Sequence, residues 1–275
     1  MAALTTTAGP QRLAAPPLPR EHGSWFMLLV PCAVGLFAAG APNLPGVLFA
    51  FVATAFFLAR QPLLLLVRPG QASAFTLWFW LGVWAAGSGL GMLALLTIYH
   101  RLLLLPLAGI GLALLLYEVW RASRSPRPDL RTEIIAAIGL ASGAPGAYVA
   151  VHGVFDLRAA MVWVLSGLYF LAAVYYVNLM LAWVKRNPHT LADRRALGKV
   201  TAGIHFAVLA ASAAFALVGL APALTPVAFL PALLKTLNQV WRGGRQTSFK
   251  RLGLVEAGQS LLFLALITVA YRFRV

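Results

Sequence analysis

The sequence is short of charge, and above all of negative charge. Its 275 residues include only seven Asp and Glu, and all charged residues together make up 11% of the chain. A soluble domain is about 25% charged, so this chain has too few charged groups to cover its surface if it folds in water. Hydrophobic residues make up 61% of it, and its mean hydropathy is +0.82. The composition predicts a polytopic membrane protein.

Cysteine and the common catalytic motifs are also scarce. The single cysteine, Cys32, lies in an apolar run, which excludes an intrachain disulfide and a cysteine-based metal cluster and predicts a buried core residue. The sequence has no Walker A loop, no dinucleotide-binding glycine motif and no His-Glu-x-x-His pair, and its five histidines are dispersed. The three aspartates fall in expected loops, so no Ser/His/Asp arrangement is supported.

The first 19 residues differ from the rest of the chain. Residues 1–19 are rich in Ala, Thr and Pro and carry one charge, Arg12. They have no continuous apolar segment of the kind found in a cleavable signal peptide. We expect residues 1–19 to form a disordered cytoplasmic tail and residues 20–275 to form a single transmembrane helical domain.

Nine apolar runs follow, each close to the 17–25 residues that cross a bilayer as a helix. Continuous runs rich in Leu and Ala favour helices over membrane strands, whose hydrophobicity alternates. We therefore expect an all-α bundle of about nine transmembrane helices, over residues 24–41, 44–67, 74–97, 102–120, 134–152, 158–184, 197–220, 223–240 and 252–272. The eighth run is the weakest, because two prolines, Lys235 and Asn238 interrupt it.

The basic residues indicate the orientation of these runs. The chain has 22 Lys and Arg and a net charge of +15, which in a soluble protein would suggest nucleic acid. When the nine runs alternate across a membrane, eighteen of the 22 basic residues fall on the side of the N-terminus. The positive-inside rule then predicts that the N-terminus lies in the cytoplasm and the C-terminus outside. The excess charge is thus explained by topology, and no nucleic-acid partner is expected.

Polar residues inside the runs gather at the same, cytoplasmic side. Placing such a residue in a membrane costs a few kcal/mol, so these positions are candidates for function. Glu256, Gln259 and Ser260 share one helix face by their spacing, as do Thr201 and His205. The candidate ligand-binding residues are Arg60, Gln61, Glu133, Asn178, Lys185, Arg186 and Glu256, and the candidate catalytic residues are Glu21 and His22.

Simpler roles compete with these. Lysine and arginine near helix ends often extend to the lipid head groups, which would account for Lys185, Arg186, Lys199 and Lys235. Arg60 lies deeper, about eight residues from the loop, so a functional or ion-paired role is favoured for it. His205 is more often a hydrogen-bonded core residue than a ligand, and Thr201 is a candidate partner.

Several short motifs resemble one family. The most specific is Pro19-Arg20-Glu21-His22-Gly23 before the first run; the others are Arg60-Gln61-Pro62, Arg131-Thr132-Glu133, Tyr175-Tyr176-Val177 through Lys185-Arg186, and Gly253-Leu254-Val255-Glu256. Together they resemble the YwiC-like family of uncharacterised bacterial membrane proteins, over nearly the whole chain after residue 18. The resemblance implies an architecture and candidate positions but no reaction.

A remoter resemblance is to UbiA-type prenyltransferases, which also have nine helices around a cytoplasm-facing cavity. Their Asp-rich motifs, which hold Mg²⁺ and pyrophosphate, lie where this chain has Arg60-Gln61-Pro62 and Asn178 through Arg186. This sequence has no Asp-rich motif there, so no Mg²⁺ site is expected and the cofactor is left open. Cations can bind a phosphate directly, with arginine giving a two-pronged contact.

The sequence therefore predicts a UbiA-like bundle with a polar, basic cavity that faces the cytoplasm. It would bind an amphiphilic anion such as an isoprenoid or lipid phosphate, with or without metal-independent group transfer. A small-molecule or lipid transporter is the second hypothesis, and would need a polar path to the outer face. The third is a non-catalytic membrane assembly subunit, which would have mutually paired polar groups and no cavity. The lipid bilayer is the one partner that follows directly, and protein partners stay undetermined.

Overall fold

The computed structural model describes residues 14–19, 22–67, 73–124, 129–186, 188, 190–243 and 248–273. These residues form helices and loops, with no strand among them. The elements are α1 (His22–Ala38), α2 (Leu44–Val67), α3 (Ala74–Thr97), α4 (Leu104–Arg124), α5 (Leu130–Ala141), α6 (Gly143–His152), α7 (Leu157–Arg186), α8 (Leu191–Leu217), the 3-10 helix η1 (Thr225–Phe229), α9 (Leu230–Trp241) and α10 (Phe249–Phe273).

The expected fold class, an all-α polytopic membrane protein, is confirmed. Seven helical segments are long and apolar enough to cross a membrane, with α5 and α6 together forming one of them. The first and eighth expected runs are shorter: the apolar stretch of α1 covers Gly23–Ala38, and η1 with α9 covers 225–241. The prolines of the eighth run explain its form, since a 3-10 turn at Thr225–Phe229 precedes the α-helix.

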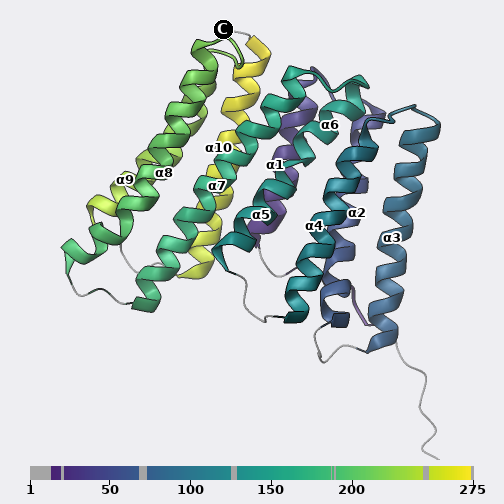
Figure 1. The fold of residues 1–275 in the computed structure, drawn as a ribbon, viewed down its shortest axis with the longest axis horizontal. Coiled ribbons are helices and arrows are strands. Elements are labelled where there is room, and N and C mark those ends of the chain that lie inside the picture. The colour runs from purple at the N-terminus through teal and green to yellow at the C-terminus, as the bar shows by residue number, and fades with distance from the viewer. Residues whose placement is uncertain are drawn as a thin grey trace, which may run out of the picture.

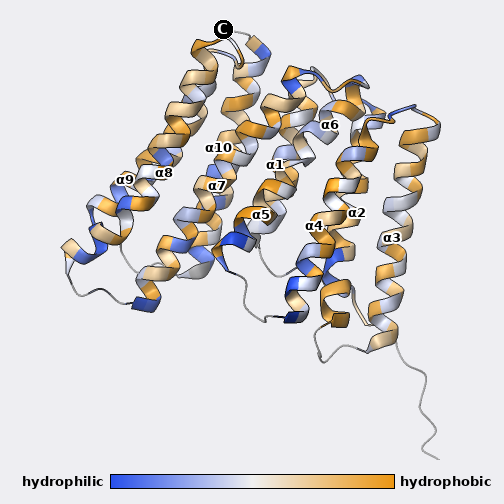
Figure 2. Cartoon of the chain, in the orientation of Figure 1, coloured by the Kyte–Doolittle hydropathy of each residue, from blue (hydrophilic) through white to orange (hydrophobic). Residues whose placement is uncertain are grey.

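The helices run up and down, so their ends gather at two faces. Figure 1 shows α4 and α7 descending where α5 and α8 ascend, and η1 with α9 returning the chain before α10 ascends. Hydrophilic residues gather where α4, α7 and α9 end and α5, α8 and α10 begin (Figure 2). We call this face the basic end, because Arg124, Lys185, Arg186, Lys250 and Arg251 lie there, all exposed.

The fifth expected run is divided at Ser142, where α5 ends and α6 begins. Small residues after the break let α6 pack closely against its neighbours. A Cβ atom on Gly143 would lie 2.7 Å from the Sγ of Cys32, which is buried as expected. A Cβ atom on Gly35 of α1 would overlap the backbone carbonyl of Ala144. The glycines are therefore required by the contact between α1 and α6.

Aromatic side chains fill the middle of the bundle between α7, α10 and η1. Tyr169 stacks on Phe263 with ring centroids 4.0 Å apart, and Phe229 packs edge-on against Phe263 at 5.5 Å. All three side chains are buried. This aromatic layer (Tyr169, Phe229 and Phe263) lies between the polar residues near the basic end of α10 and its opposite end.

Two of the few arginines at the opposite end bind the carbonyls that follow or end helices. Arg101 donates to the carbonyls of Ala150 and Val151 at the end of α6, at 2.9 and 3.1 Å. Arg272 donates to the carbonyl of Gly40, just after α1, at 3.2 Å. A cation at a helix C-terminus satisfies free carbonyls and the helix dipole. These arginines therefore have local structural roles.

Residues before α1 are described only over 14–19, where they form no helix. The indole nitrogen of Trp80 donates to the carbonyl of Ala14 at 3.0 Å, so this stretch contacts α3. The rest of the expected tail, at 1–13, lies outside the described residues and stays a prediction.

The contact between α1 and α6 gives a stability prediction. We expect Gly35→Ala to lower the free energy of unfolding in detergent by about 1–3 kcal/mol, because the added methyl group forces two backbones apart. Gly82→Ala is the matched control, since nothing lies within 4 Å of a Cβ at Gly82 and alanine favours a helix. Equal unfolding midpoints for the two variants would contradict the assigned packing.

Candidate functional site

Arg60 and Glu118 join α2 to α4 within the half of the bundle nearer the basic end. Arg60 Nε donates to Glu118 Oε2 at 2.6 Å, and Arg60 Nη2 bonds the other carboxylate oxygen. The side chains are only 19% and 22% exposed. A two-pronged pair of this kind is the strongest arrangement for an arginine and a carboxylate. Of the two roles favoured for Arg60, the ion-paired one is therefore found.

Glu133 and Asn178 form a second contact, between α5 and α7. Asn178 donates one hydrogen bond from Nδ2 to Glu133 Oε2 and another to the carbonyl of Val174 at 3.1 Å. Both side chains are half-buried. The structure thus brings together two candidate residues that are 45 positions apart in the chain.

Lys235 and Glu256 form an ion pair between α9 and α10 that is more enclosed than the pair of Arg60 with Glu118. Lys235 Nζ lies 2.5 Å from Glu256 Oε1, and the side chains are 14% and 13% exposed. Lys235 Nζ also lies 3.8 Å from the centroid of the Tyr176 ring on α7, a favourable cation–π contact. Lys235 therefore does not extend to the lipid head groups, which was the simpler role considered for it.

His205 is a hydrogen-bonded core histidine, as the sequence favoured. Its Nδ1 lies 2.9 Å from the carbonyl oxygen of Thr201, and its Nε2 lies 3.1 Å from the Thr236 hydroxyl. The residue is 4% exposed. Thr201 is its partner through the backbone, while the Thr201 hydroxyl donates to the Tyr175 carbonyl at 3.4 Å.

Lys185 and Arg186 have a different setting, at the last two positions of α7. Both side chains are exposed, and the structure gives neither a hydrogen-bond partner among the described residues. Arg60 is not close to them, because α2 and α7 reach the basic end at separate places with α4 and α5 between (Figure 1). The three cations expected to hold one anion are thus not assembled at one point.

The structure describes the remaining candidate residues only in part. Gln61 is half-buried on α2, next to Arg60. Glu21 lies outside the described residues, and His22 begins α1 without a described side chain. The catalytic role expected for Glu21 and His22 stays a prediction.

Some cations at the basic end bind helix carbonyls. Arg195 donates from Nε and Nη2 to the carbonyl of Trp241 at 3.1 and 2.8 Å, and its guanidinium lies 4.7 Å from the centroid of the Trp241 ring. Arg194 donates to the carbonyl of Gly243 at 2.8 Å. These contacts tie the start of α8 to the end of α9. Arg194 and Arg195 are therefore engaged structurally, unlike Lys185 and Arg186.

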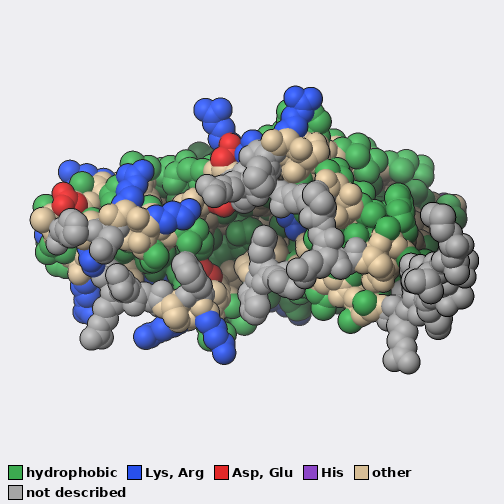
Figure 3. Space-filling view, turned by 90° about the horizontal axis from the view of Figure 1, so that it is seen from below, with side chains coloured by type: hydrophobic (Ala, Val, Ile, Leu, Met, Phe, Trp, Pro, Cys, Tyr) green, Lys and Arg blue, Asp and Glu red, His purple; other side chains and the backbone are tan. Residues whose placement is uncertain are grey.

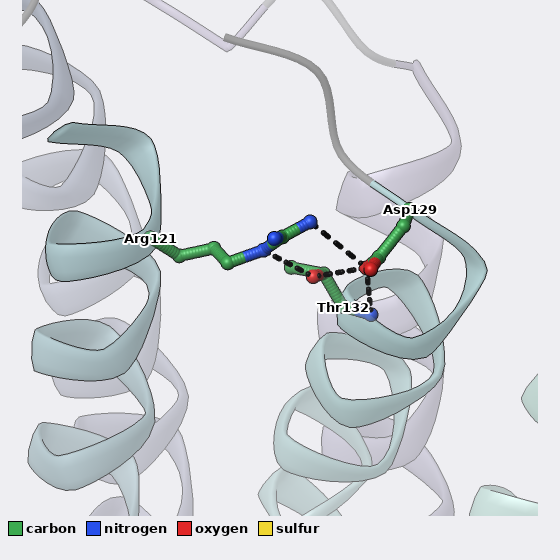
Figure 4. A network of polar contacts seen from close by, with 3 residues as sticks. All are labelled: Arg121, Asp129 and Thr132. Atoms are coloured by element: carbon green, nitrogen blue, oxygen red, sulfur yellow. Dashed lines mark hydrogen bonds and ion pairs between the residues drawn. The ribbon is translucent and has the colours of Figure 1, made fainter. Parts of the chain in front are cut away.

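The connection from α4 to α5 is held by a small network (Figure 4). Arg121 forms an ion pair with Asp129 at 3.0 Å and donates to the Thr132 hydroxyl, also at 3.0 Å. The Asp129 carboxylate accepts from the Thr132 hydroxyl and caps α5 by accepting from its backbone N–H. The bonds from Thr132, helped by Arg121, hold the pKa of Asp129 below its ordinary value.

Viewed from the basic end, the molecule presents cations beside an apolar recess. Lys and Arg side chains project at the margin of the left and middle of this face, hydrophobic side chains lie deeper near its middle, and Asp or Glu side chains lie close to them (Figure 3). Such a face can bind a negative group at its margin and an apolar chain in its recess. Within the described part of the chain, no three His, Cys, Asp or Glu side chains group so that they could hold a metal ion.

The similarities to known proteins agree with the motifs. The family model described as YwiC-like protein matches residues 18–148. Over 258 residues the chain is 24% identical to the Uncharacterized protein YwiC of Bacillus subtilis (strain 168), an alignment that covers 91% of this chain and 96% of the relative. The predicted resemblance to YwiC-like proteins is confirmed. No solved structure matches the chain significantly, so the remoter resemblance to UbiA-type prenyltransferases stays a prediction.

The first ion pair gives a thermodynamic prediction. Arg60→Met leaves the Glu118 carboxylate half-buried without its partner, so we expect the free energy of unfolding to fall by about 2 kcal/mol. Arg60→Met combined with Glu118→Gln should cost less than the sum of the two single substitutions. A double-mutant cycle of unfolding in detergent measures this coupling, and strictly additive costs would show that the pair adds no stability.

The Asp129 network gives a pH prediction. Because the folded pKa of Asp129 lies below its ordinary value of 3.8, its stabilisation is complete above that value and is lost as the pH falls through the folded pKa. We expect Asp129→Asn to be slightly less stable at neutral pH, and its stability to fall less than that of the wild type on acidification. Unfolding in detergent from pH 7 to pH 2 measures the difference, and parallel curves would argue against the network.

Proposed function

We propose that this chain, similar to a YwiC-like protein along most of its length, binds an amphiphilic anion at its basic end. The ligand class is a lipid or isoprenoid with a phosphate or carboxylate head. The observation that carries the proposal is the apolar recess bordered by exposed cations. A head group would find positive charge at the margin of that face, and its hydrocarbon chain would find an apolar surface beside it.

Lys185 and Arg186 are the cations best suited to meet the ligand first. They are exposed, adjacent in sequence, and without a hydrogen-bond partner among the described residues. Arg194 and Arg195, in contrast, bind carbonyls. Arg60 and Glu133 keep their present contacts with Glu118 and Asn178 in this proposal, and group transfer without a metal ion would be a later step. We further propose that the basic end faces the cytoplasm, as the positive-inside rule expects.

Transport receives less support than binding. A conduit needs polar groups through the membrane, but the polar face of α10 ends at the aromatic layer: Glu256 and Ser260 are followed by buried Phe263 and Ile267. The third hypothesis, a non-catalytic assembly subunit, is the second candidate. It is favoured by the mutual pairing of Arg60 with Glu118 and of Lys235 with Glu256.

Native mass spectrometry of the purified protein separates binding from assembly. An anionic lipid or prenyl phosphate that remains bound through purification supports the proposal. Retention of neutral lipid alone, in a protein that also fails to bind added phosphatidic acid, would favour the assembly subunit.

The two cations of α7 provide a sharper test with a matched control. We expect Lys185→Ala with Arg186→Ala to weaken phosphatidic acid binding by about thirtyfold, at about 1 kcal/mol for each cation near the surface. Lys250→Ala with Arg251→Ala removes the same charge from another exposed pair at the same end. Equal weakening by both double variants would mean that diffuse charge, and no site at the end of α7, attracts the lipid.

A further inference from the structure

A row of hydrogen-bond donors that lack good acceptors lines the space between α7 and α9. Among the described residues, the buried indole nitrogen of Trp183 has no hydrogen-bond partner, and its side chain is only 8% exposed. Within the same residues, the amide nitrogen of Gln239 meets the thioether of Met180 alone, at 3.9 Å. Leaving a buried donor unsatisfied is costly, so such donors suggest a missing acceptor.

The two donors lie beside side chains that follow one another along α7 and α9. Tyr176, Met180 and Trp183 are four and three positions apart, so they share one face of α7. Lys235 lies against Tyr176, and Gln239, one turn further along α9, lies against Met180. The series from Trp183 to Tyr176 extends about 10 Å along α7, away from the basic end.

Exposed cations and buried apolar side chains lie next to this row. Lys185 and Arg186 follow Trp183 directly at the exposed end of α7. Tyr176, Met180, Trp183 and Leu252 form a buried apolar cluster, with Val240 of α9 packed against it. The inner limit is the aromatic layer, where Tyr169 stacks on Phe263. The row therefore begins among exposed cations, runs beside apolar side chains and ends in the bundle.

We propose that this row is the head-group site, and that the ligand's negative group binds Lys235 in place of Glu256, which takes up a proton as it leaves the lysine. The inference rests on the proposed function and deepens it, because it names the site and the charge of the ligand. Glu256 is an internal carboxylate that occupies Lys235, and it competes with the ligand. Lys235 supplies one positive charge, so the matching head group carries one negative charge, as a carboxylate or a phosphodiester does.

The other buried cation is a weaker candidate for this role. Arg60 uses both prongs of its guanidinium on Glu118, and that carboxylate is bound at both of its oxygens. Between Lys235 and the exposed end of α7, the donors of Gln239 and Trp183 remain available to further acceptor atoms of a ligand. The Glu256 oxygen bonds Lys235 and, in the described contacts, meets neither of these two donors.

The experiment compares the same substitution at the two ion pairs. Native mass spectrometry or nanodisc titration would measure the binding of oleate, phosphatidylglycerol and phosphatidic acid, with phosphatidylcholine as the neutral lipid. Glu256→Gln removes the competing charge, so we expect oleate or phosphatidylglycerol to bind about tenfold more tightly, while Glu118→Gln, the matched control, leaves binding unchanged. Trp183→Phe removes one donor and should weaken binding by about fivefold.

A second variant covers the case in which Glu256→Gln does not fold. Lys235→Met with Glu256→Gln leaves no buried charge between α9 and α10, and we expect it to fold and to lose the specific binding of both singly charged lipids. The Lys235 site would be overturned if Glu118→Gln, and not Glu256→Gln, tightened lipid binding. It would also be overturned if the neutral double variant bound lipid like the wild type. Either result would leave the proposed function intact. Failure of the wild type to bind any of the anionic lipids would overturn both.

Discussion

The arrangement of this protein depends on the cost of placing a charge in hydrocarbon. A charged side chain inside a membrane needs a partner, and removing one partner leaves the other in an environment that does not solvate it. The described helices meet this requirement pairwise: Arg60 with Glu118 between α2 and α4, and Lys235 with Glu256 between α9 and α10. Each pair connects two helices at membrane depth, so satisfying the charge also fixes which helices are neighbours.

The same constraint explains how the excess of positive charge is distributed. With only seven acidic residues in the chain, most cations cannot have a carboxylate partner. Arg101 and Arg195 instead bind carbonyls at the ends of α6 and α9, where the helix dipole favours them. Lys185 and Arg186 remain exposed. Those exposed residues are the ones free to meet an external anion.

Much of the fold could be predicted from the sequence, because hydrophobic run length and basic loops are local signals. The run at 74–97 coincides with α3, and the run at 44–67 coincides with α2. The form of the eighth run was harder to predict. Its prolines mark an irregularity, but whether they produce a kink or a 3-10 turn depends on packing against α8 and α10.

The candidate site was harder to predict from the sequence, because pairing between distant helices leaves no local sequence signal. Helical spacing puts Glu256, Gln259 and Ser260 on one face, yet it does not say that Lys235 meets Glu256. From the sequence alone, Lys235 was equally well explained as a cation that extends to the lipid head groups. Trp183 was not singled out, since tryptophan near a helix end is typical of the membrane interface. Its unsatisfied nitrogen becomes visible only once its neighbours are known.

The packing of α1 has a consequence for the order of assembly. This helix is made first, yet it packs chiefly against α6 and α10, and its Gly35 surface fits Ala144, more than a hundred residues later. Each helix can enter the bilayer as it is synthesised, but α1 has no complete set of neighbours until α10 arrives. The contacts of α1 with α10 therefore form only after the last of the described helices has been made. Until then, the short apolar first helix is held by lipid alone on the side that later contacts α10.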